Sequence, residues 1–202
     1  MNDTRRRTSL IPDQRALFSI ASGQGGYFTV DQAKSAGYSA ALLAHHAKTG
    51  RFRRVRRGLY RFQEYPVSPR EDVLATWLRA GDSAVVSHES ALDLLNLSDV
   101  VPRYVHVTVP RARRHLRHLP GARIHTTAEP VPPQDKVTRD GIVVTSATRS
   151  ILDSAQAGAA PEQITLAIVQ AVERGLASPG ELKKRSSERS RRVERLIAAA
   201  LT

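Results

Sequence analysis

The sequence predicts an α+β protein, with an N-terminal winged helix-turn-helix followed by a mixed α/β domain that has a small sheet and a helical, basic C-terminal tail. Three short helical patterns precede the stretch RFRRVRRGLYRF at residues 51–62, which has the alternation of a two-stranded hairpin. Strand patterns and helix patterns then alternate through the second half of the chain. Positive charge is concentrated at the two ends of the chain, as expected for a basic binding module joined to a neutral domain.

The N-terminal elements follow from capping and stop signals. Residues 1–11 are expected to form a mobile basic arm that carries Arg5, Arg6 and Arg7. Pro12 and Asp13 are typical of a helix start, and the glycines of SGQGG end that helix. Thr29 and Ser39 are suited to cap helices at residues 30–36 and 40–49, and only two residues join those helices. Such a tight turn predicts a winged helix-turn-helix domain over residues 12–66, with the junction at 68–72.

The hairpin predicted at residues 51–62 has two kinds of side chain. Its apolar residues recur at positions that can cover the three helices, and Gly58 tolerates the positive φ of a tight turn. Arg56 and Arg57 stand directly before that glycine, so the tip is expected to present two adjacent arginines to phosphates or to a minor groove. The alternative is a solvated, charged strand edge. Six arginines and no acidic residue across the stretch favour the first interpretation.

The second domain is expected to span residues 67–202. Helical spacing predicts helices at 71–79, 91–96, 147–157 and 161–175, and a basic helical tail from residue 181. Alternating β-branched residues predict strands at 104–109, 122–127 and 141–145. Ser87 and Ser146 each follow a strand and precede a helix, so both are expected to be N-caps.

Charge indicates the class of partner. The net charge of the 202 residues is +12, and it is distributed as 12 basic and 4 acidic side chains in residues 1–66, 12 of each in 67–180, and 7 and 3 in 181–202. An excess of this size is typical of proteins that bind nucleic acid or an anionic surface. The chain has no cysteine, which fits a cytoplasmic location, and no apolar run approaches the ~20 residues needed to span a membrane.

Two sequence blocks resemble a known family. GYSAALLAHHAKTGRFRRVRRGLYRF at residues 37–62 is similar to the helix-and-wing segment of the AbiEi family of bacterial antitoxins. VVSHESALDLLNLSDVVPRYVHVTVP at 85–110, followed by GIVVTSATRSILDSA at 141–155, is similar to the domain that follows such wings in that family. AbiEi proteins belong to type IV toxin–antitoxin and abortive-infection operons, so the resemblance implies that residues 67–202 form an antitoxin domain.

The resemblance also implies partners. AbiEi-like proteins repress their own operon by binding promoter inverted repeats, and they counteract a nucleotidyltransferase-like toxin, either by direct contact or by indirect antagonism. Ala40 and Ala41 stand where the family often has long polar residues, which shifts the expected DNA affinity towards the wing and the arm. The residues expected to face DNA are Ser39, His45, Lys48, Arg51, Arg53, Arg54, Arg56 and Arg57, together with Arg5, Arg6 and Arg7 of the arm.

Two further basic clusters leave alternatives open. Arg111, Arg113, Arg114 and Arg117 form a possible second surface for DNA or for a toxin, or a solvated helix or loop. The tail cluster at residues 183–192 has the same alternatives. Two other functions remain open for the whole chain: a direct toxin-binding neutraliser without operator specificity, and a stand-alone transcription regulator.

Neither catalysis nor a bound cofactor is expected. The adjacent residues of SHES at 87–90 cannot converge as a catalytic triad, and no Walker loop or H-E-x-x-H pattern occurs. The seven histidines show no ligand spacing along the chain, so no metal site is predicted.

Overall fold

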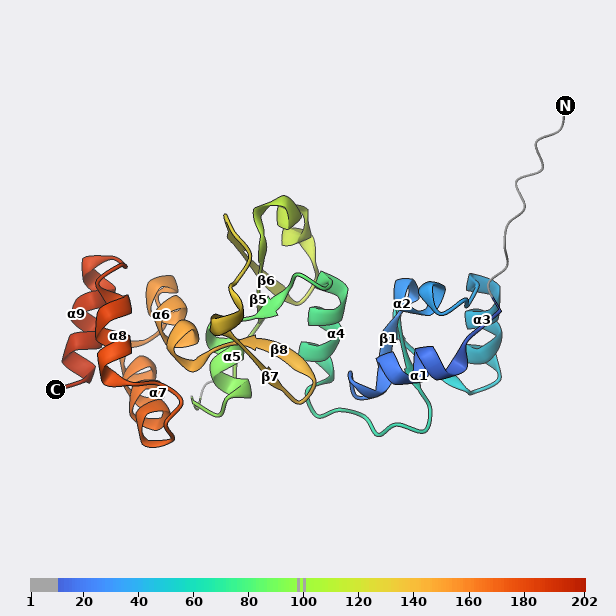
Figure 1. Ribbon diagram of the computed structural model, residues 1–202, viewed down its shortest axis with the longest axis horizontal. Helices are drawn as coiled ribbons and strands as arrows, with labels where there is room; N and C mark the ends of the chain where they lie inside the picture. Colours follow the sequence, from blue (N-terminus) through green and yellow to red (C-terminus); the bar gives the residue numbers. More distant parts are fainter. Residues whose placement is uncertain (1–10, 98, 100) are drawn as a thin grey trace, which may run out of the picture. The chain divides into compact units, whose positions relative to one another are not determined.

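Residues 11–97, 99 and 101–202 are described by a computed structural model (Figure 1), in which the chain divides into two units. The first unit ends at Glu71 and the second begins at Asp72. Apart from Ile11, the predicted arm, with Arg5, Arg6 and Arg7, lies outside the described residues.

The first unit is a three-helix core closed by a small sheet. Asp13 caps α1 by accepting from the Ala16 N–H at 2.9 Å, and Thr29 forms a capping box with Gln32 at the start of α2. The strands are ordered β1-β3-β2, so the predicted two-stranded wing gains a third, antiparallel strand. The elements are α1 (Gln14–Ser22), β1 (Tyr27–Thr29), α2 (Val30–Ser35), α3 (Ala40–Lys48), β2 (Phe52–Arg56) and β3 (Leu59–Phe62).

Aromatic side chains join the sheet of the first unit to its helices. The rings of Phe28, Phe52 and Phe62 are buried, and their centroids lie 5.0 to 5.4 Å apart. Leu17 and Leu43 pack onto the same cluster from α1 and α3. The apolar positions of the hairpin therefore anchor it to the helices, which fixes where its arginines emerge.

The second unit is built on a five-stranded mixed sheet in the order β6-β5-β4-β8-β7. One face of this sheet packs against Trp77 and Ala80 of α4 through Val107, Val109 and Ile124. Helix α5 contacts β5 and β8 (Figure 1). The strands are β4 (Val85–Val86), β5 (Val105–Pro110), β6 (Ala122–Thr127), β7 (Lys136–Arg139) and β8 (Ile142–Thr145). Of these, β4 was expected as the strand that precedes Ser87, and β7 was not predicted, because it is short and flanked by polar residues.

Helices gather at the C-terminal end of the second unit, where α6 contacts α5, α7, α8 and α9 (Figure 1). The helix expected at residues 91–96 begins earlier, at His88, and the basic tail forms two helices. The helices are α4 (Glu71–Ala80), α5 (His88–Leu94), α6 (Ala147–Ala157), α7 (Pro161–Glu173), α8 (Pro179–Ser186) and α9 (Arg191–Ala200), and the 3-10 segments are η1 (Arg111–His118) and η2 (Pro133–Asp135). No helix among the described residues is long and apolar enough to cross a membrane.

Candidate nucleic-acid interface

Helix α3 presents a sparse outer face. Ser39 caps it by accepting from the Leu42 N–H at 3.1 Å, so this hydroxyl is already used within the helix. Leu43 is buried against the core, whereas Ala41, His45 and Lys48 are exposed. The face that can enter a groove therefore offers one imidazole and one ammonium group among small side chains.

His46 is a packing residue of the first unit. Its ring lies 5.0 Å from Phe52 and 5.9 Å from Tyr38, measured between ring centroids. Burial lowers the pKa of His46 below its ordinary value, and the positive charge of Arg51 lowers it further. His46 is therefore held neutral on the inner side of α3, whereas its neighbour His45 remains on the surface.

The wing carries its exposed charge along β2 and at the turn that follows. Arg53 and Arg54 pair with Arg61 and Tyr60 of β3, and the ladder then slips by one residue at a bulge around Val55. Gly58 turns the chain with φ of 80°. The exposed side chains are Arg53, Arg54, Arg56 and Arg57, whereas Arg51, directly before β2, is half-buried.

One arginine of the stretch has a structural role that the sequence pattern concealed. Arg61 is 3% exposed, donates to the carbonyl of Tyr65, and holds its guanidinium 5.8 Å from the centroid of the Tyr27 ring. All four residues of β3 are buried, and β3 is the central strand of its sheet. Arg61 does not face solvent because β3 lies between β1 and β2. The sequence pattern did not reveal this, because it did not predict that β1 pairs with β3.

The basic cluster at residues 111–117 also contains both exposed arginines and an arginine with a structural role. Arg111 and Arg114 are exposed on η1, but Arg113 turns inward and donates to the carbonyl of Ala80 at 2.8 Å. The side chain of Arg117 lies outside the described part of the chain. This second basic surface is therefore smaller than the sequence suggests.

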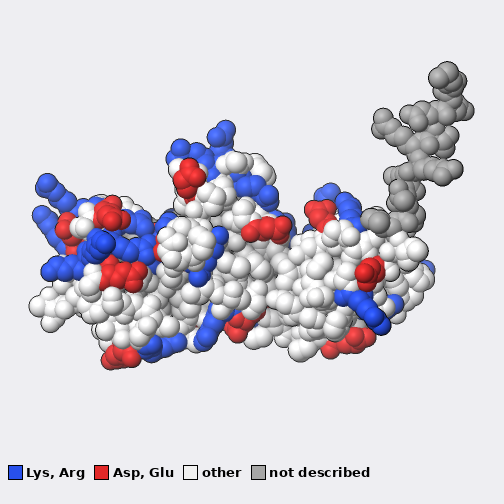
Figure 2. Space-filling view, viewed as in Figure 1, with Lys and Arg blue, Asp and Glu red and all other residues white. Residues whose placement is uncertain are grey.

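Two arginines of the basic tail form internal ion pairs, and a third donates to a backbone carbonyl. Arg185 donates to both carboxylate oxygens of Asp135, at 2.7 and 2.9 Å, and Arg189 donates to Asp153 at 2.8 Å. Arg192 donates to the carbonyl of Ala155. Figure 2 shows blue and red atoms mixed over the α8–α9 end of the second unit. The exposed basic residues of this cluster are Lys183, Lys184, Arg191 and Arg192.

These pairs set the ionisation of Asp135. Burial alone would raise the pKa of this carboxyl group, but hydrogen bonds and positive charge from Arg185 and Arg149 lower it below its usual value. Asp135 is therefore a buried carboxylate that anchors α6 and α8 to η2, and Arg149 bridges it to Asp153.

The motif SHES at residues 87–90 starts helix α5 and does not form a triad. Ser87 is fully buried, and its Oγ accepts from the Thr108 hydroxyl at 2.7 Å. Ser87 occupies the N-cap position of α5, as predicted, but its side chain makes no capping hydrogen bond, whereas the side chain of Ser146 does cap α6. Glu89 lies beside His106, with 3.7 Å between its Oε2 and Nε2 of that ring. The motif instead brings His88 next to two histidines of the sheet, which spacing along the chain did not reveal.

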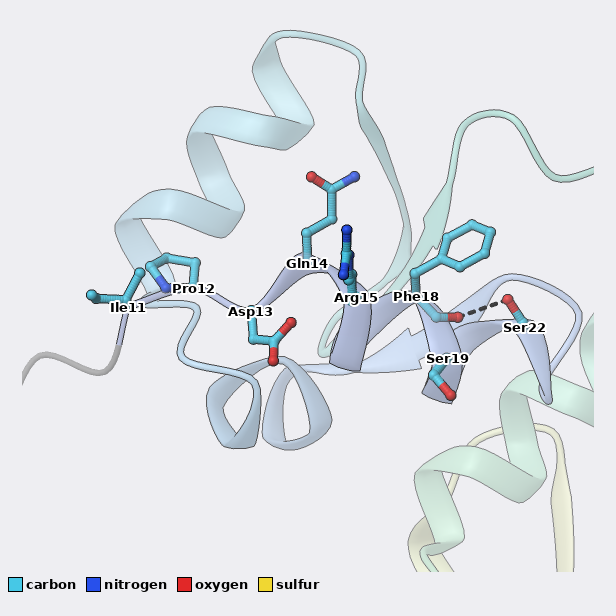
Figure 3. A pocket seen from close by; sticks show the side chains of 8 residues that line it. All are labelled: Ile11, Pro12, Asp13, Gln14, Arg15, Phe18, Ser19 and Ser22. Atoms are coloured by element: carbon cyan, nitrogen blue, oxygen red, sulfur yellow. Dashed lines mark hydrogen bonds between the residues drawn. The ribbon is translucent and has the colours of Figure 1, made fainter.

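A shallow recess of about 1110 Å³ lies along α1 (Figure 3). Its described lining runs from Ile11 to Ser22. Asp13 is occupied by its capping bond, and Ser22 donates to the carbonyl of Phe18 at 2.7 Å. The lining therefore gathers no group of side chains suited to a metal or to catalysis.

The first unit matches a known protein family. Residues 15–63 match the family model described as "Transcriptional regulator, AbiEi antitoxin", which confirms the resemblance for the helices and the wing. That match stops before the second sequence block. No curated protein matches the chain.

A solved structure shares the fold. The crystal structure of RV2827C protein from Mycobacterium tuberculosis aligns with a TM-score of 0.55 over 93% of this chain and 75% of that one, at 16% sequence identity. At this identity the likeness concerns the fold, and it extends the α+β architecture to the second unit.

Proposed function

We propose that this chain, whose residues 15–63 match the AbiEi antitoxin regulators, represses its own operon by binding promoter inverted repeats and counteracts a nucleotidyltransferase-like toxin in the bacterial cytoplasm. The first unit is the DNA-binding part of the proposal, and the second unit is the antitoxin part. The chain is proposed to act by binding, without catalysis.

The observation that carries the DNA half is the charge of the α3–wing face. Residues 32–63 contain no acidic side chain, and Arg53, Arg54 and Arg57 are exposed on the wing, close in sequence to Lys48 of α3. In a winged helix, the helix after the turn enters the major groove and the wing contacts the flanking backbone or minor groove. Exposed basic residues on both elements, with no acidic side chain between them in the sequence, support that mode of docking.

The composition of this face indicates how the binding energy is divided. Alanines occupy much of the outer side of α3, so His45 and Lys48 are the described side chains there that can reach base edges. The wing arginines instead suit phosphates, whose contacts give affinity without sequence information. We therefore expect strong salt dependence and a modest preference for the operator over other DNA.

A salt titration of binding tests the DNA half. Fluorescence anisotropy with the chain's own promoter fragment is expected to give a log–log slope of about −5 to −7, for roughly five to eight phosphate contacts. The double variant Arg54→Ala/Arg57→Ala removes two exposed wing charges and is expected to flatten the slope by about 2. Its matched control, Lys183→Ala/Lys184→Ala, removes two exposed charges from α8 and is expected to leave the slope unchanged.

The outcomes separate the alternatives. Equal affinity for the promoter and for shuffled DNA contradicts the repressor role, and an equal loss in both double variants contradicts the placement of DNA on the wing. The toxin half is tested separately, by co-expression with the neighbouring toxin gene. Failure of the full chain to restore growth contradicts the antitoxin role and leaves the DNA result standing. Rescue by the wing variant shows that antitoxicity does not require DNA binding.

A further inference from the structure

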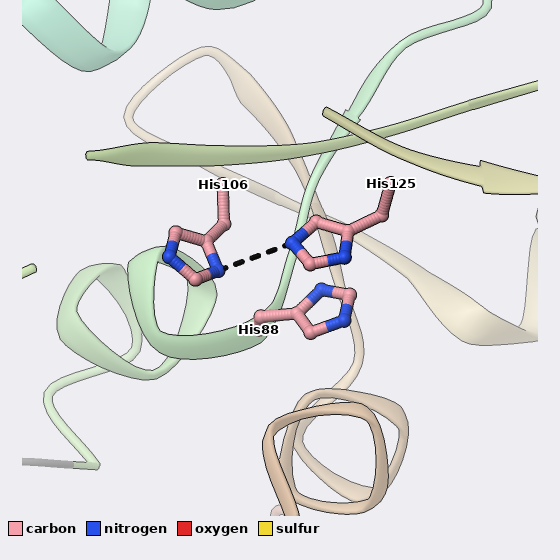
Figure 4. A group of neighbouring side chains, drawn as sticks. All are labelled: His88, His106 and His125. Atoms are coloured by element: carbon pink, nitrogen blue, oxygen red, sulfur yellow. Dashed lines mark hydrogen bonds between the residues drawn. The ribbon is translucent and has the colours of Figure 1, made fainter. Parts of the chain in front are cut away.

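Three histidines from separate elements meet on one face of the second unit's sheet (Figure 4). His88 is the first residue of α5, His106 lies in β5 and His125 in β6. In the parallel register of β5 and β6, His106 pairs with Arg123 and Thr108 pairs with His125, so the two strand histidines share a face. This face is opposite the one that packs on Trp77.

The spacing of the ring nitrogens suits a metal ion. Nε2 of His125 lies 3.3 Å from Nδ1 of His106. Two imidazole nitrogens bound at ~2.0–2.1 Å to a tetrahedral zinc ion are about 3.4 Å apart. One nitrogen from each of the three rings falls within 4.8 Å of the others, and the His88 ring stacks on His125 with 3.5 Å between centroids. Nδ1 of His88 shares a hydrogen bond with the Ser87 hydroxyl at 2.9 Å, so metal binding by His88 uses Nε2 or exchanges that hydrogen bond for the ion.

The surroundings keep the imidazoles in the form that binds metals. Burial lowers the pKa of His88 to about 2 and those of His106 and His125 to about 4, so all three rings are neutral near pH 7 and each has one unprotonated nitrogen. Without a metal, His125 Nε2 and His106 Nδ1 share a hydrogen bond, which an ion between them would replace. The Glu89 carboxylate, 3.7 Å from Nε2 of His106, favours a proton on that nitrogen. The opposite nitrogen, Nδ1, is then the one left to face His125, as in carboxylate–histidine–metal arrangements.

The backbone at His88 adds an independent observation. His88 is buried and has φ of 54°, a left-handed conformation that bulky residues rarely adopt. Asparagine or glycine would accept this conformation more easily. Residues held in such conformations cluster at functional sites, and here the strained backbone delivers the imidazole to the cluster.

Cavities with unsatisfied polar atoms adjoin the cluster. A cavity of about 290 Å³ reaches His88, His125 and Thr127, and one of about 80 Å³ reaches His88, His106 and Ser154. The hydroxyl oxygens of Thr127 and Ser154 are buried without a hydrogen-bond partner. Buried hydroxyl groups normally have partners, so both cavities are suited to hold water or another small ligand beside the histidines.

We propose that His88, His106 and His125 bind one divalent transition-metal ion of the zinc class and leave a further coordination position open towards the adjoining cavity. Three imidazoles suit Zn²⁺, Co²⁺ or Ni²⁺ better than Mg²⁺ or Ca²⁺, which prefer oxygen ligands. The positive charge of Arg149 beside the cavity is offset by its ion pairs with Asp135 and Asp153. This site is independent of the proposed DNA binding and lies in the other unit.

A cobalt titration of the full-length chain tests the proposal. The protein is purified without a polyhistidine tag, dialysed against a chelator and titrated with CoCl₂, and the visible absorption of tetrahedral or five-coordinate Co²⁺ is recorded. One equivalent is expected to bind, and ZnCl₂ is expected to displace it and abolish the absorption. The expected apparent melting temperature is higher with Zn²⁺ than after chelation, because a ligand that binds the folded state stabilises it.

Variants identify the ligands. His106→Ala and His125→Ala each remove one imidazole, and His88→Asn removes the third while keeping a residue that tolerates the left-handed backbone. All three are expected to lose the cobalt band. His115→Ala and His118→Ala are the matched controls, because both side chains are exposed on η1 of the same unit, and both are expected to retain it.

The wild-type titration decides the proposal even if a variant fails to fold, and circular dichroism checks the folding of each variant. Absence of a stoichiometric band in the wild-type chain overturns the site. An unchanged band in folded His88→Asn, His106→Ala and His125→Ala protein also overturns it. Loss confined to those three variants supports it.

Discussion

Replacing Asp135 by asparagine tests whether the basic tail is structural. The change keeps the size of the side chain and removes its charge, which leaves Arg185 without its bidentate partner and Arg149 with Asp153 alone. Removing one member of a buried pair costs about 3–5 kcal/mol. Because the Arg149 and Arg185 side chains are 17% and 24% exposed and water can solvate them in part, we expect a loss of about 3 kcal/mol in the free energy of unfolding.

The chain contains its own reporter for this measurement. Trp77 is the single tryptophan and lies in α4 of the second unit, where its Nε1 donates to the carbonyl of Ala84 at 2.9 Å. Urea unfolding followed by tryptophan fluorescence therefore reports the second unit. Glu181→Gln is the matched control, because Glu181 also contacts Arg185, at 3.2 Å, but is exposed, and its loss is expected to stay within about 0.5 kcal/mol.

The pH dependence provides a second check on Asp135. Its pKa is lowered in the folded state, so the carboxylate contributes stability above its unfolded pKa of about 3.9, and this contribution is lost as the pH falls below that value. The difference between wild type and Asp135→Asn should therefore shrink below about pH 4. A difference under about 0.5 kcal/mol at pH 7 would refute the anchoring role, since surface changes have effects of that size.

Three further outcomes are expected. In chelator-treated protein, the second unit should lose about 4 kcal/mol of stability between pH 7.5 and 5.5. His88, His106 and His125 bind protons in the unfolded state from about pH 6.5 downwards but have folded pKa values of about 4 or lower. Urea unfolding at each pH measures this loss, and a flat profile contradicts it. Gly58→Ala should destabilise the first unit by about 1 kcal/mol. The cause is the φ of 80° at this position alone, since an added Cβ meets no atom within 4 Å. Calorimetry measures the effect, and an unchanged melting temperature would contradict it. Ser39→Asp should keep the α3 cap but weaken DNA binding, because its negative charge repels a phosphate at the start of the helix. Ser39→Ala should instead cost about 1 kcal/mol of stability. Equal DNA affinity for the two variants would argue against phosphates near the start of α3.

The sequence by itself determined the features that depend on neighbouring residues. Asp13, Thr29, Ser39 and Ser146 begin helices because their side chains can reach backbone N–H groups two or three residues ahead, and such signals are local. The alternation of apolar residues and arginines in the wing likewise predicted which side chains anchor it. The order of these elements indicated the winged helix.

Only the tertiary structure decided which polar side chains are exposed and which meet. Arg61 is buried because β1 adds a strand beside β3, and Arg185 and Arg189 point inward because Asp135 and Asp153 lie across from them. The same holds for His88, His106 and His125, which come from a helix start and two strands. Contacts between distant segments leave no periodic signal along the chain, because they depend on strand register and helix packing. Charge and histidine content were therefore visible in the sequence, but their use was determined by the fold.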